Sequence, residues 1–194
     1  YNVVVGAYVV NNSISIFQNN EIGLSDYGNA DFSENLCGTV ARNSANIIAG
    51  NLVNFIEENN CLEIDDNSGV GINKNANPIG LIVANIVGYV EQNTSDNISG
   101  NYADEIKENN CNVKDNYANK INRNTSGRDI EGNIATNIED NSNAGVIRNN
   151  TMSESIRLNS MFSGSIENNI GVTIYRNTNN GAVTNNIVAF IEDN

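Results

Sequence analysis

The chain contains no histidine and no tryptophan, one proline, and only 10 lysine and arginine residues among its 194 residues. Without histidine it lacks the side chain that most often acts as a general base or metal ligand near neutral pH. Aspartate and glutamate number 23, which gives a formal net charge of −13. Because such a surface repels nucleic-acid backbones and anionic membranes, we expect neither as a partner.

Long apolar runs are also absent. No stretch approaches eighteen consecutive apolar residues, so the sequence predicts no membrane insertion. The chain begins at Tyr1 and shows no secretory signal. Both observations fit either a mature secreted chain or a fragment of a longer one. The sequence therefore predicts an extracellular or cell-surface location.

Asparagine, in contrast, is abundant, with 43 residues. An apolar residue followed three places later by asparagine recurs about every eight residues along the whole chain, as in Ile48/Asn51 and Ile56/Asn59. A fixed short period over the whole length indicates stacked units and a single domain, residues 1–194. Asparagine tolerates left-handed backbone, so we expect it to occupy the bend itself, where stacked asparagines can also bond to one another. The predicted ladder residues are Asn35, Asn43, Asn51, Asn59, Asn67, Asn85, Asn93, Asn101, Asn109, Asn133 and Asn141.

The number of octads in one coil decides the shape of the solenoid. Cys37, Cys61 and Cys111 each follow a repeat asparagine by two places, and Cys37 and Cys61 are 24 residues apart. Coils of three octads put all three cysteines in one column, whereas coils of two octads put Cys37 and Cys61 on opposite sides. Three octads also separate an acidic column from a basic one and gather most insertions at one corner.

The sequence therefore predicts an all-β fold: a single three-sided parallel β-helix of about eight coils, each of roughly 24 residues. With about 4.8 Å between paired strands, the rod is expected to be near 40 Å long. Asparagine ladders are expected at the turns, and isoleucine and valine in the core. Neither end carries an evident cap.

This repeat resembles right-handed parallel β-helices of the pectate-lyase-like type, and above all the asparagine-rich repeats of carbohydrate-binding and sugar-hydrolysing members. The resemblance covers essentially the whole chain and lies in the repeat length and the Ile-x-x-Asn motif. It implies a right-handed coil and makes glycans a candidate partner. The tyrosines are scattered, and only Tyr175 beside Arg176 is expected to be an exposed contact.

Candidate catalytic groups are few. Members of that group that cut pectin-like sugars carry aspartate clusters, Gly-His-Gly or Arg-Ile-Lys segments, or calcium-binding acids with a basic residue. This chain has no histidine and no Arg-Ile-Lys segment. The acidic column of Asp66, Asp115 and Asp140 could supply carboxylates at the spacing of the coils, but a solvated acidic face is the favoured interpretation. Basic residues such as Arg123 are predicted on another face, so we expect no enzymatic activity and no cofactor.

The acidic column could instead bind calcium, which prefers several oxygen ligands. The candidate ligands are Asp66, Asp115, Asp140 and Asp193. Screening of these charges by water and salt is the favoured alternative. For the three cysteines, the odd count and the small-residue positions favour buried packing thiols over a disulfide between Cys37 and Cys61.

The repeat runs to Asn194 without a capping segment. A solenoid end exposes strand edges that can pair with another copy, and such a contact does not close on itself. The function that we expect is a non-enzymatic structural solenoid, either an extracellular filament subunit or the shaft of a surface protein, assembled by end-to-end coil stacking. The alternative is a carbohydrate-binding or adhesive module; a polysaccharide lyase or hydrolase ranks third.

Overall fold

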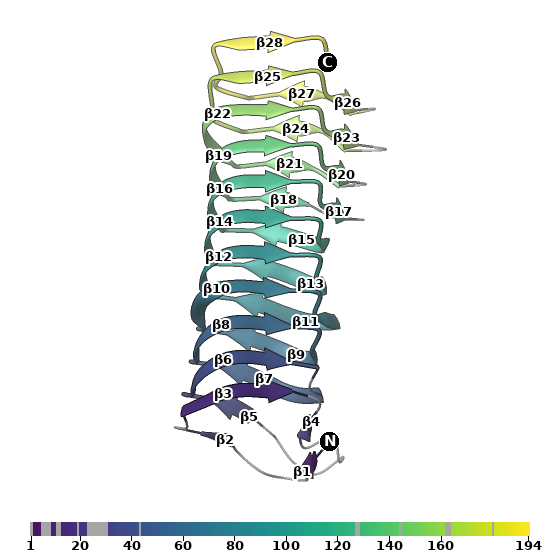
Figure 1. Ribbon diagram of the computed structural model, residues 1–194. Coiled ribbons are helices and arrows are strands. Elements are labelled where there is room, and N and C mark those ends of the chain that lie inside the picture. The colour runs from purple at the N-terminus through teal and green to yellow at the C-terminus, as the bar shows by residue number, and fades with distance from the viewer. Residues whose placement is uncertain are drawn as a thin grey trace.

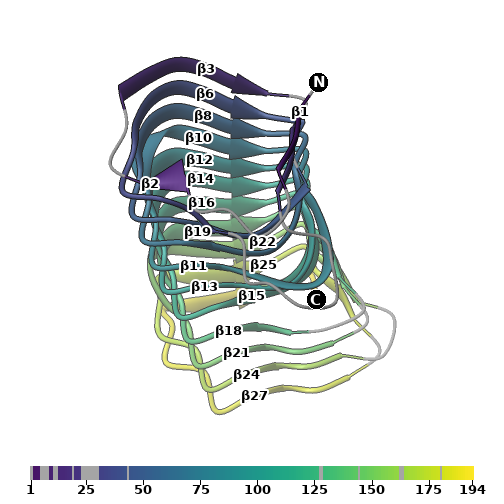
Figure 2. The ribbon, with the colours of Figure 1, turned by 90° about the horizontal axis from the view of Figure 1, so that it is seen from below.

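The structure is a computed structural model that describes residues 2–4, 9–10, 13–18, 20–22, 31–42, 44–126, 129–143, 145–161, 164–179 and 181–194. Its described strands are all paired in parallel and form a rod-shaped β-solenoid (Figure 1). The predicted all-β parallel solenoid with asparagine ladders is therefore confirmed. Seen along its axis, the rod has two long sides joined by turns (Figure 2).

Two sheets make the long sides. Sheet I has 13 strands: β1 (Asn2–Val4), β2 (Val9–Val10), β4 (Asn20–Ile22), β5 (Asp31–Ser33), β7 (Ser44–Ala49), β9 (Asn60–Asp65), β11 (Ala76–Val83), β13 (Thr94–Ser99), β15 (Asn110–Lys114), β18 (Ile130–Glu131), β21 (Ile147–Arg148), β24 (Ile166–Glu167) and β27 (Val183–Thr184). Sheet II has 11 strands: β3 (Ser13–Gln18), β6 (Leu36–Ala41), β8 (Leu52–Glu57), β10 (Ser68–Asn73), β12 (Ile86–Glu91), β14 (Tyr102–Lys107), β16 (Tyr117–Asn122), β19 (Ile134–Glu139), β22 (Thr151–Arg157), β25 (Thr173–Tyr175) and β28 (Phe190–Glu192).

The coil is shorter than predicted. Asn35 bonds to Asn51, 16 residues on, and the later ladder steps range from 15 to 19 residues. One coil therefore holds two octads, and the prediction of about 24 residues and three octads is wrong. Sheet II stacks 11 strands, one for each coil, where about eight coils were predicted. The rod is accordingly about 50 Å long at ~4.8 Å for each coil.

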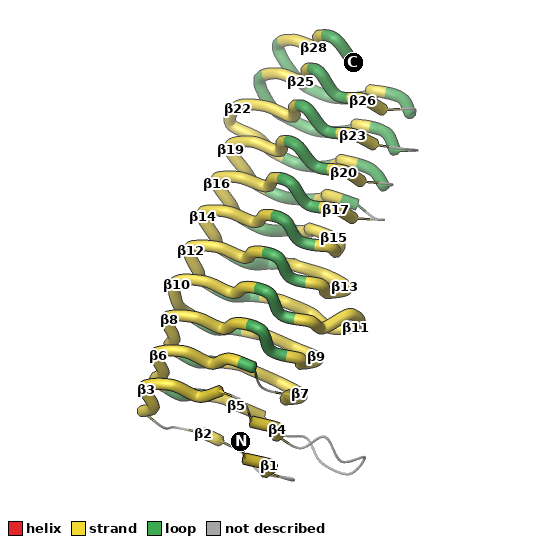
Figure 3. The backbone as a smooth tube through the Cα atoms, turned by 45° about the vertical axis from the view of Figure 1, so that its right-hand side comes forward, coloured by secondary structure: helices red, strands yellow, loops and turns green. Residues whose placement is uncertain are grey.

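The coil is short because each octad ends in a turn that leads the chain from one sheet to the opposite sheet. Two octads and two turns therefore close one coil. Among the described residues a third side begins at Thr125, where a sheet III of 4 strands follows sheet II and precedes sheet I along the chain. Figure 3 shows these short strands after the stacked turns that follow sheet II. They are β17 (Thr125–Ser126), β20 (Ser142–Asn143), β23 (Ser160–Met161) and β26 (Thr178–Asn179).

The core is a double column of branched aliphatic side chains. The fifth residue of a typical strand points inward, as Ile56 does from sheet II and Ile64 from sheet I, and both are 0% exposed. Smaller residues such as Val53, Cys61 and Ala103 fill the second position. Full burial of one isoleucine contributes roughly 1.5–3 kcal/mol, and each coil packs only against its neighbours along the rod.

Two asparagine ladders run inside the two turns. The Asn51 side chain is typical: its Nδ2 donates to Oδ1 of Asn67 at 2.9 Å and to the carbonyl of Phe32 at 3.0 Å. The backbone N–H of Asn51 also donates to Oδ1 of Asn67, at 3.0 Å. The first ladder holds Asn35, Asn51, Asn67, Asn85, Asn101, Asn116, Asn133, Asn150, Asn169 and Asn186. The second holds Asn59, Asn75, Asn93, Asn109, Asn124, Asn141, Asn159, Asn177 and Asn194.

Ten of the eleven predicted ladder residues lie in these two ladders, and Asn43 lies outside the described residues. The left-handed backbone of the turn, however, falls on the residue before each ladder asparagine. Examples are Ala84 (φ 52°), Asp115 (φ 52°) and Leu158 (φ 55°), with Gly100 (φ 63°) in the same role. The asparagine side chain is thus free to point inward, where it replaces the hydrogen bonds that the turn breaks.

Candidate functional surface

The outer surface of the solenoid has two unlike edges, one beside each ladder. The residue that follows each first-ladder asparagine lies at the start of the sheet II side of a coil, and its side chain is exposed. Eight of the ten such positions from Leu36 onward carry large apolar side chains, 49–69% exposed. We call this row the apolar ridge. Its residues, in register, are Leu36, Leu52, Ser68, Ile86, Tyr102, Tyr117, Ile134, Thr151, Ile170 and Ile187.

The equivalent row beside the second ladder is polar, and we call it the polar edge. Its residues are all exposed and carry, with one exception, hydroxyl or amide groups. The same octad position therefore has opposite chemistry on the two edges, so the apolar ridge is not a by-product of the repeat. The polar edge comprises Asn60, Ala76, Thr94, Asn110, Thr125, Ser142, Ser160 and Thr178.

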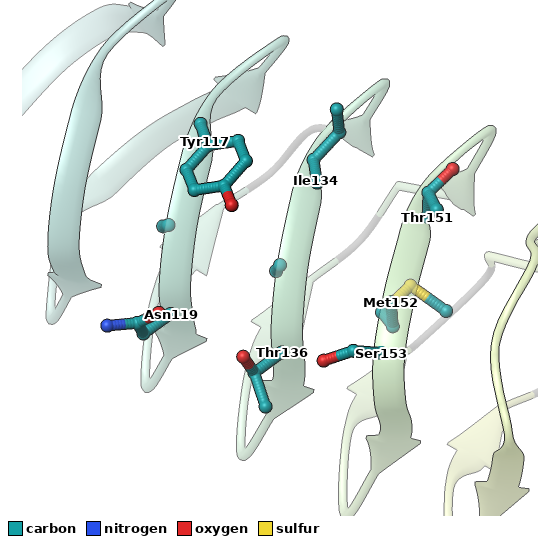
Figure 4. Close-up of a pocket in the computed structure, with 9 residues that line it drawn as sticks. Tyr117, Asn119, Ile134, Thr136, Thr151, Met152 and Ser153 are labelled. Atoms are coloured by element: carbon teal, nitrogen blue, oxygen red, sulfur yellow. The ribbon is translucent and has the colours of Figure 1, made fainter.

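Two tyrosines lie in the middle of the apolar ridge. The rings of Tyr102 and Tyr117 stack with their centroids 4.8 Å apart and 3° between their planes. Beside Tyr117 a shallow groove of about 200 Å³ opens on the outer face of β16, β19 and β22. Figure 4 shows its walls as two rows of side chains, with Tyr117, Ile134 and Thr151 in one row. Asn119, Thr136 and Ser153 form the other row.

The four candidate calcium ligands do not come together. Asp66 and Asp115 lie at turns beside the first ladder, three coils apart. Asp140 and Asp193 lie beside the second ladder, also three coils apart. At ~4.8 Å for each coil the members of a pair are about 14 Å apart, too far to ligate one ion. Within the described ranges, no three His, Cys, Asp or Glu residues are grouped as for a metal ion.

The predicted separation of an acidic and a basic column is wrong, because the 16-residue step mixes the two classes. Beside the second ladder, Arg42 pairs with Glu58 of the next coil at 3.3 Å. Arg123 pairs with Glu108 of the preceding coil at 3.2 Å, and Asp140 occupies the same turn position in the next coil. Charges of opposite sign thus alternate along the rod and favour the native register.

Ion pairs also cross the outer faces of both sheets. On sheet I, Arg148 contacts Glu131 at 3.0 Å, and this hydrogen bond holds the pKa of the Glu131 carboxyl below its ordinary value. On sheet II, Lys107 bonds to Glu105 at 2.8 Å and lowers the pKa of that carboxyl. Tyr175 is not a free contact: its hydroxyl accepts a hydrogen bond from Arg157 at 3.0 Å.

The cysteines occupy both sheets. Cys37 lies in β6 of sheet II, whereas Cys61 and Cys111 lie in β9 and β15 of sheet I. The predicted single column is therefore wrong. Cys61 and Cys111 are free and buried, and burial raises the pKa of each thiol to about 12. These two act as the small packing residues that the sequence predicted; the Cys37 side chain lies outside the described part.

Comparisons with protein-family models, with curated proteins and with solved structures find no match. The resemblance to pectate-lyase-like β-helices thus extends to a parallel β-solenoid and no further. Across the described ranges no helix is long and apolar enough to cross a bilayer.

The apolar ridge was missed at the level of sequence. Its signal is visible once the octads are sorted into two alternating classes rather than three. Large apolar residues then follow the asparagines of one class, as Leu52 follows Asn51, whereas small polar residues follow those of the other, as Asn60 follows Asn59. When the octads are sorted into three classes instead, the large apolar residues and the small polar residues are both spread over all three classes.

Proposed function

We propose that the chain is a non-enzymatic structural solenoid, the stiff shaft of an extracellular or cell-surface assembly. The observation that carries this proposal is the uninterrupted bonding of coil to coil. Each step of a ladder adds two hydrogen bonds to one asparagine Oδ1, as at Asn101 and Asn116 with 3.0 Å each. The buried isoleucine columns run parallel to both ladders. Side-chain ladders of this kind join each coil to the next along the axis.

The proposal extends to end-to-end stacking. Ile191 continues the isoleucine column of sheet II but is 52% exposed, whereas its register partner Ile174 is 0% exposed. Its strand, β28, lies at the end of sheet II. A further coil stacked there would cover Ile191 and supply an acceptor for the backbone N–H of Asn194, as Asn194 does for Asn177 at 3.1 Å. A second copy of the chain can supply such a coil.

Electron microscopy of the purified chain tests this stacking. We expect fibres of constant width that are much longer than the ~50 Å of one chain. The Ile191→Lys variant, which puts a charge in the stacking face, is expected to shorten them to single rods. Thr178→Lys, on the polar edge, is the matched control and should leave the fibres unchanged. Short rods in the unsubstituted chain would contradict end-to-end stacking by copies of this chain.

Glycan binding is the second candidate, and the groove beside Tyr117 favours it because Asn119, Thr136 and Ser153 offer polar groups there. Against it, one face of the Tyr117 ring is covered by Tyr102. A glycan screen with an Asn119→Ala, Ser153→Ala control would decide this. Binding that the double substitution abolishes would support the second candidate, and absence of any binding would reject it.

A further inference from the structure

Along the ten positions from Leu36 to Ile187, the order of residue classes in the apolar ridge is the same in both directions; Ser13 of β3, the register partner of Leu36, lies beyond these ten positions and has no counterpart at the other end. Its centre lies between Tyr102 and Tyr117, which are neighbours in register. One step outward on either side is an isoleucine, Ile86 on one side and Ile134 on the other. Each of these four side chains is 49–61% exposed.

The symmetry continues to the ends of the ridge. The next step outward is a hydroxyl residue on both sides, Ser68 and Thr151, and these are the only two polar members of the ridge. Beyond them, two large aliphatic residues complete each half: Leu52 and Leu36 on one side, Ile170 and Ile187 on the other. A palindromic row is what a two-fold axis perpendicular to the rod requires, because such an axis places each half of the row against the other half.

From this order we propose that two copies of the chain pair side by side and antiparallel through the apolar ridge. The two-fold axis passes between Tyr102 and Tyr117, so that Tyr102 of one copy faces Tyr117 of the other. Ile86 then faces Ile134, and the hydroxyl of Ser68 faces that of Thr151. Every large apolar residue of the ridge meets another apolar residue.

The charges beside the ridge agree with this arrangement. The turn positions flanking it carry three carboxylates, those of Glu34, Asp66 and Asp115, and no basic residue. The same axis places Asp66 opposite Asn149 of the other copy, and Asp115 opposite Gly100. Glu34 in turn faces Asn185. Each carboxylate therefore meets an amide or a glycine rather than another carboxylate, which would be repulsive.

The size of the contact sets the strength to expect. The ridge spans ten coils, about 43 Å at ~4.8 Å for each step. A strip about 10–12 Å wide on each copy buries on the order of 900–1,000 Å² in total, below the ~1,200–2,000 Å² of stable specific interfaces and in the range of weak, reversible contacts. A net charge of −13 on each copy opposes pairing over long range, and salt screens this repulsion. We expect a dissociation constant on the order of 1–10 µM at about 0.3 M salt.

Sedimentation equilibrium of the Ile191→Lys chain, in which end-to-end stacking is blocked, tests the pairing. This chain should show a reversible monomer–dimer equilibrium with a dissociation constant on the order of 1–10 µM, and it should be mostly dimeric at ~200 µM. Ile86→Lys and Ile134→Glu, each added alone to this chain, should weaken dimerisation by about 100-fold, because each buries an unpaired charge. These positions are exposed in the single rod, so the circular dichroism spectrum and unfolding midpoint should not change. A monomer at all concentrations up to ~200 µM in the Ile191→Lys chain would overturn the proposal.

The double variant, Ile86→Lys with Ile134→Glu, tests the orientation. In the antiparallel pair the two-fold axis brings the lysine of each copy opposite the glutamate of the other copy, which gives two ion pairs. The affinity of dimerisation should therefore return to within about 10-fold of its original value. In a parallel pair each side chain faces its own equivalent, like charges meet, and the double variant should stay monomeric, which would reject the antiparallel axis. Asn110→Lys with Ser142→Glu, on the polar edge, is the matched control and should not change the mass.

Electron micrographs of the unsubstituted chain and of the Ile86→Lys variant distinguish lateral pairing from end-to-end stacking. Lateral pairing doubles the width of a particle, whereas end-to-end stacking changes its length. We expect Ile86→Lys to halve the width and leave the length as it was. A loss of length without a loss of width would contradict the role assigned to the apolar ridge.

Discussion

The ring of Tyr89 lies over Gly71 of the preceding coil, where a side-chain methyl group would come within 2.3 Å of the ring carbon Cζ. Gly71 thus leaves the space that the tyrosine ring fills on the outer face of sheet II. We expect Gly71→Ala to lower the free energy of unfolding by about 1–2 kcal/mol, because the ring must move away.

The matched measurement is the same substitution in a Tyr89→Ala background. There the clash is absent, and alanine suits a strand better than glycine, so Gly71→Ala should be neutral or stabilising by up to about 1 kcal/mol. Urea unfolding of the unsubstituted chain, the two single variants and the double variant gives the coupling free energy between positions 71 and 89. Equal costs in both backgrounds would show that the ring and the glycine do not interact.

Removal of one ladder asparagine should be costly. The Asn101 side chain accepts two bonds from Asn85 and donates to the carbonyl of Ile82. Asn101→Ala leaves these buried groups without partners, at about 1–3 kcal/mol for each group, so we expect a total loss of about 3–5 kcal/mol. Asn119→Ala, at an exposed asparagine, is the control and should change stability by less than about 0.5 kcal/mol. Denaturant midpoints of both variants provide the comparison.

The left-handed turn positions predict opposite effects at two adjacent coils. Ala84 adopts φ 52° and Gly100 adopts φ 63° in the same column. Ala84→Gly should raise the free energy of unfolding by about 0.5–1 kcal/mol, because glycine has no Cβ to strain. Gly100→Ala should lower it by about 1 kcal/mol. Thermal unfolding is the measurement, and the same sign for both changes would contradict the assignment of strain to these positions.

Acid should weaken the fold partly through Glu131. Its pKa is lowered in the folded chain, with the Arg148 hydrogen bond as the largest cause. A lowered folded pKa stabilises the fold above the unfolded pKa of about 4.3, and this contribution is lost as pH falls through the folded value. Glu131→Gln should therefore lower the unfolding midpoint at pH 7 and flatten its fall below about pH 4.3. Asp66→Asn, which removes the same charge, is the control, and an equal flattening there would argue against the ion pair.

The buried thiols should be unreactive in the folded chain. Burial raises the pKa of Cys61 and Cys111 to about 12. In a Cys37→Ala background, a thiol reagent at pH 8 should label neither residue until denaturant is added, and then both. Because the folded values are raised, stability should fall as pH rises above about 8.5, the ordinary thiol pKa. Rapid labelling in the absence of denaturant would show that the packing around these residues opens readily.

The octad pattern was enough to predict a great deal of this fold. Contacts in a solenoid join equivalent positions of neighbouring coils, so the repeat of isoleucine and asparagine predicts the core column and the ladders at Asn51 or Asn101 without knowledge of the coil length. The burial of Ile56 and Ile64 follows for the same reason. The turn chemistry was assigned one residue too late, because asparagine tolerates left-handed backbone and masked the role of residues such as Ala84.

The sequence by itself determined a parallel β-solenoid with asparagine ladders, because every octad carries the same inward residues. Only the tertiary structure decided how many octads close a coil. Steps of 16 and of 24 residues both bring isoleucine onto isoleucine and asparagine onto asparagine, so the pattern alone cannot separate them. That choice puts Cys37 and Cys61 in different sheets, places Arg123 beside Glu108 and aligns Tyr102 with Tyr117. The outward residues gather into an apolar ridge and a polar edge only when the coil closes after two turns.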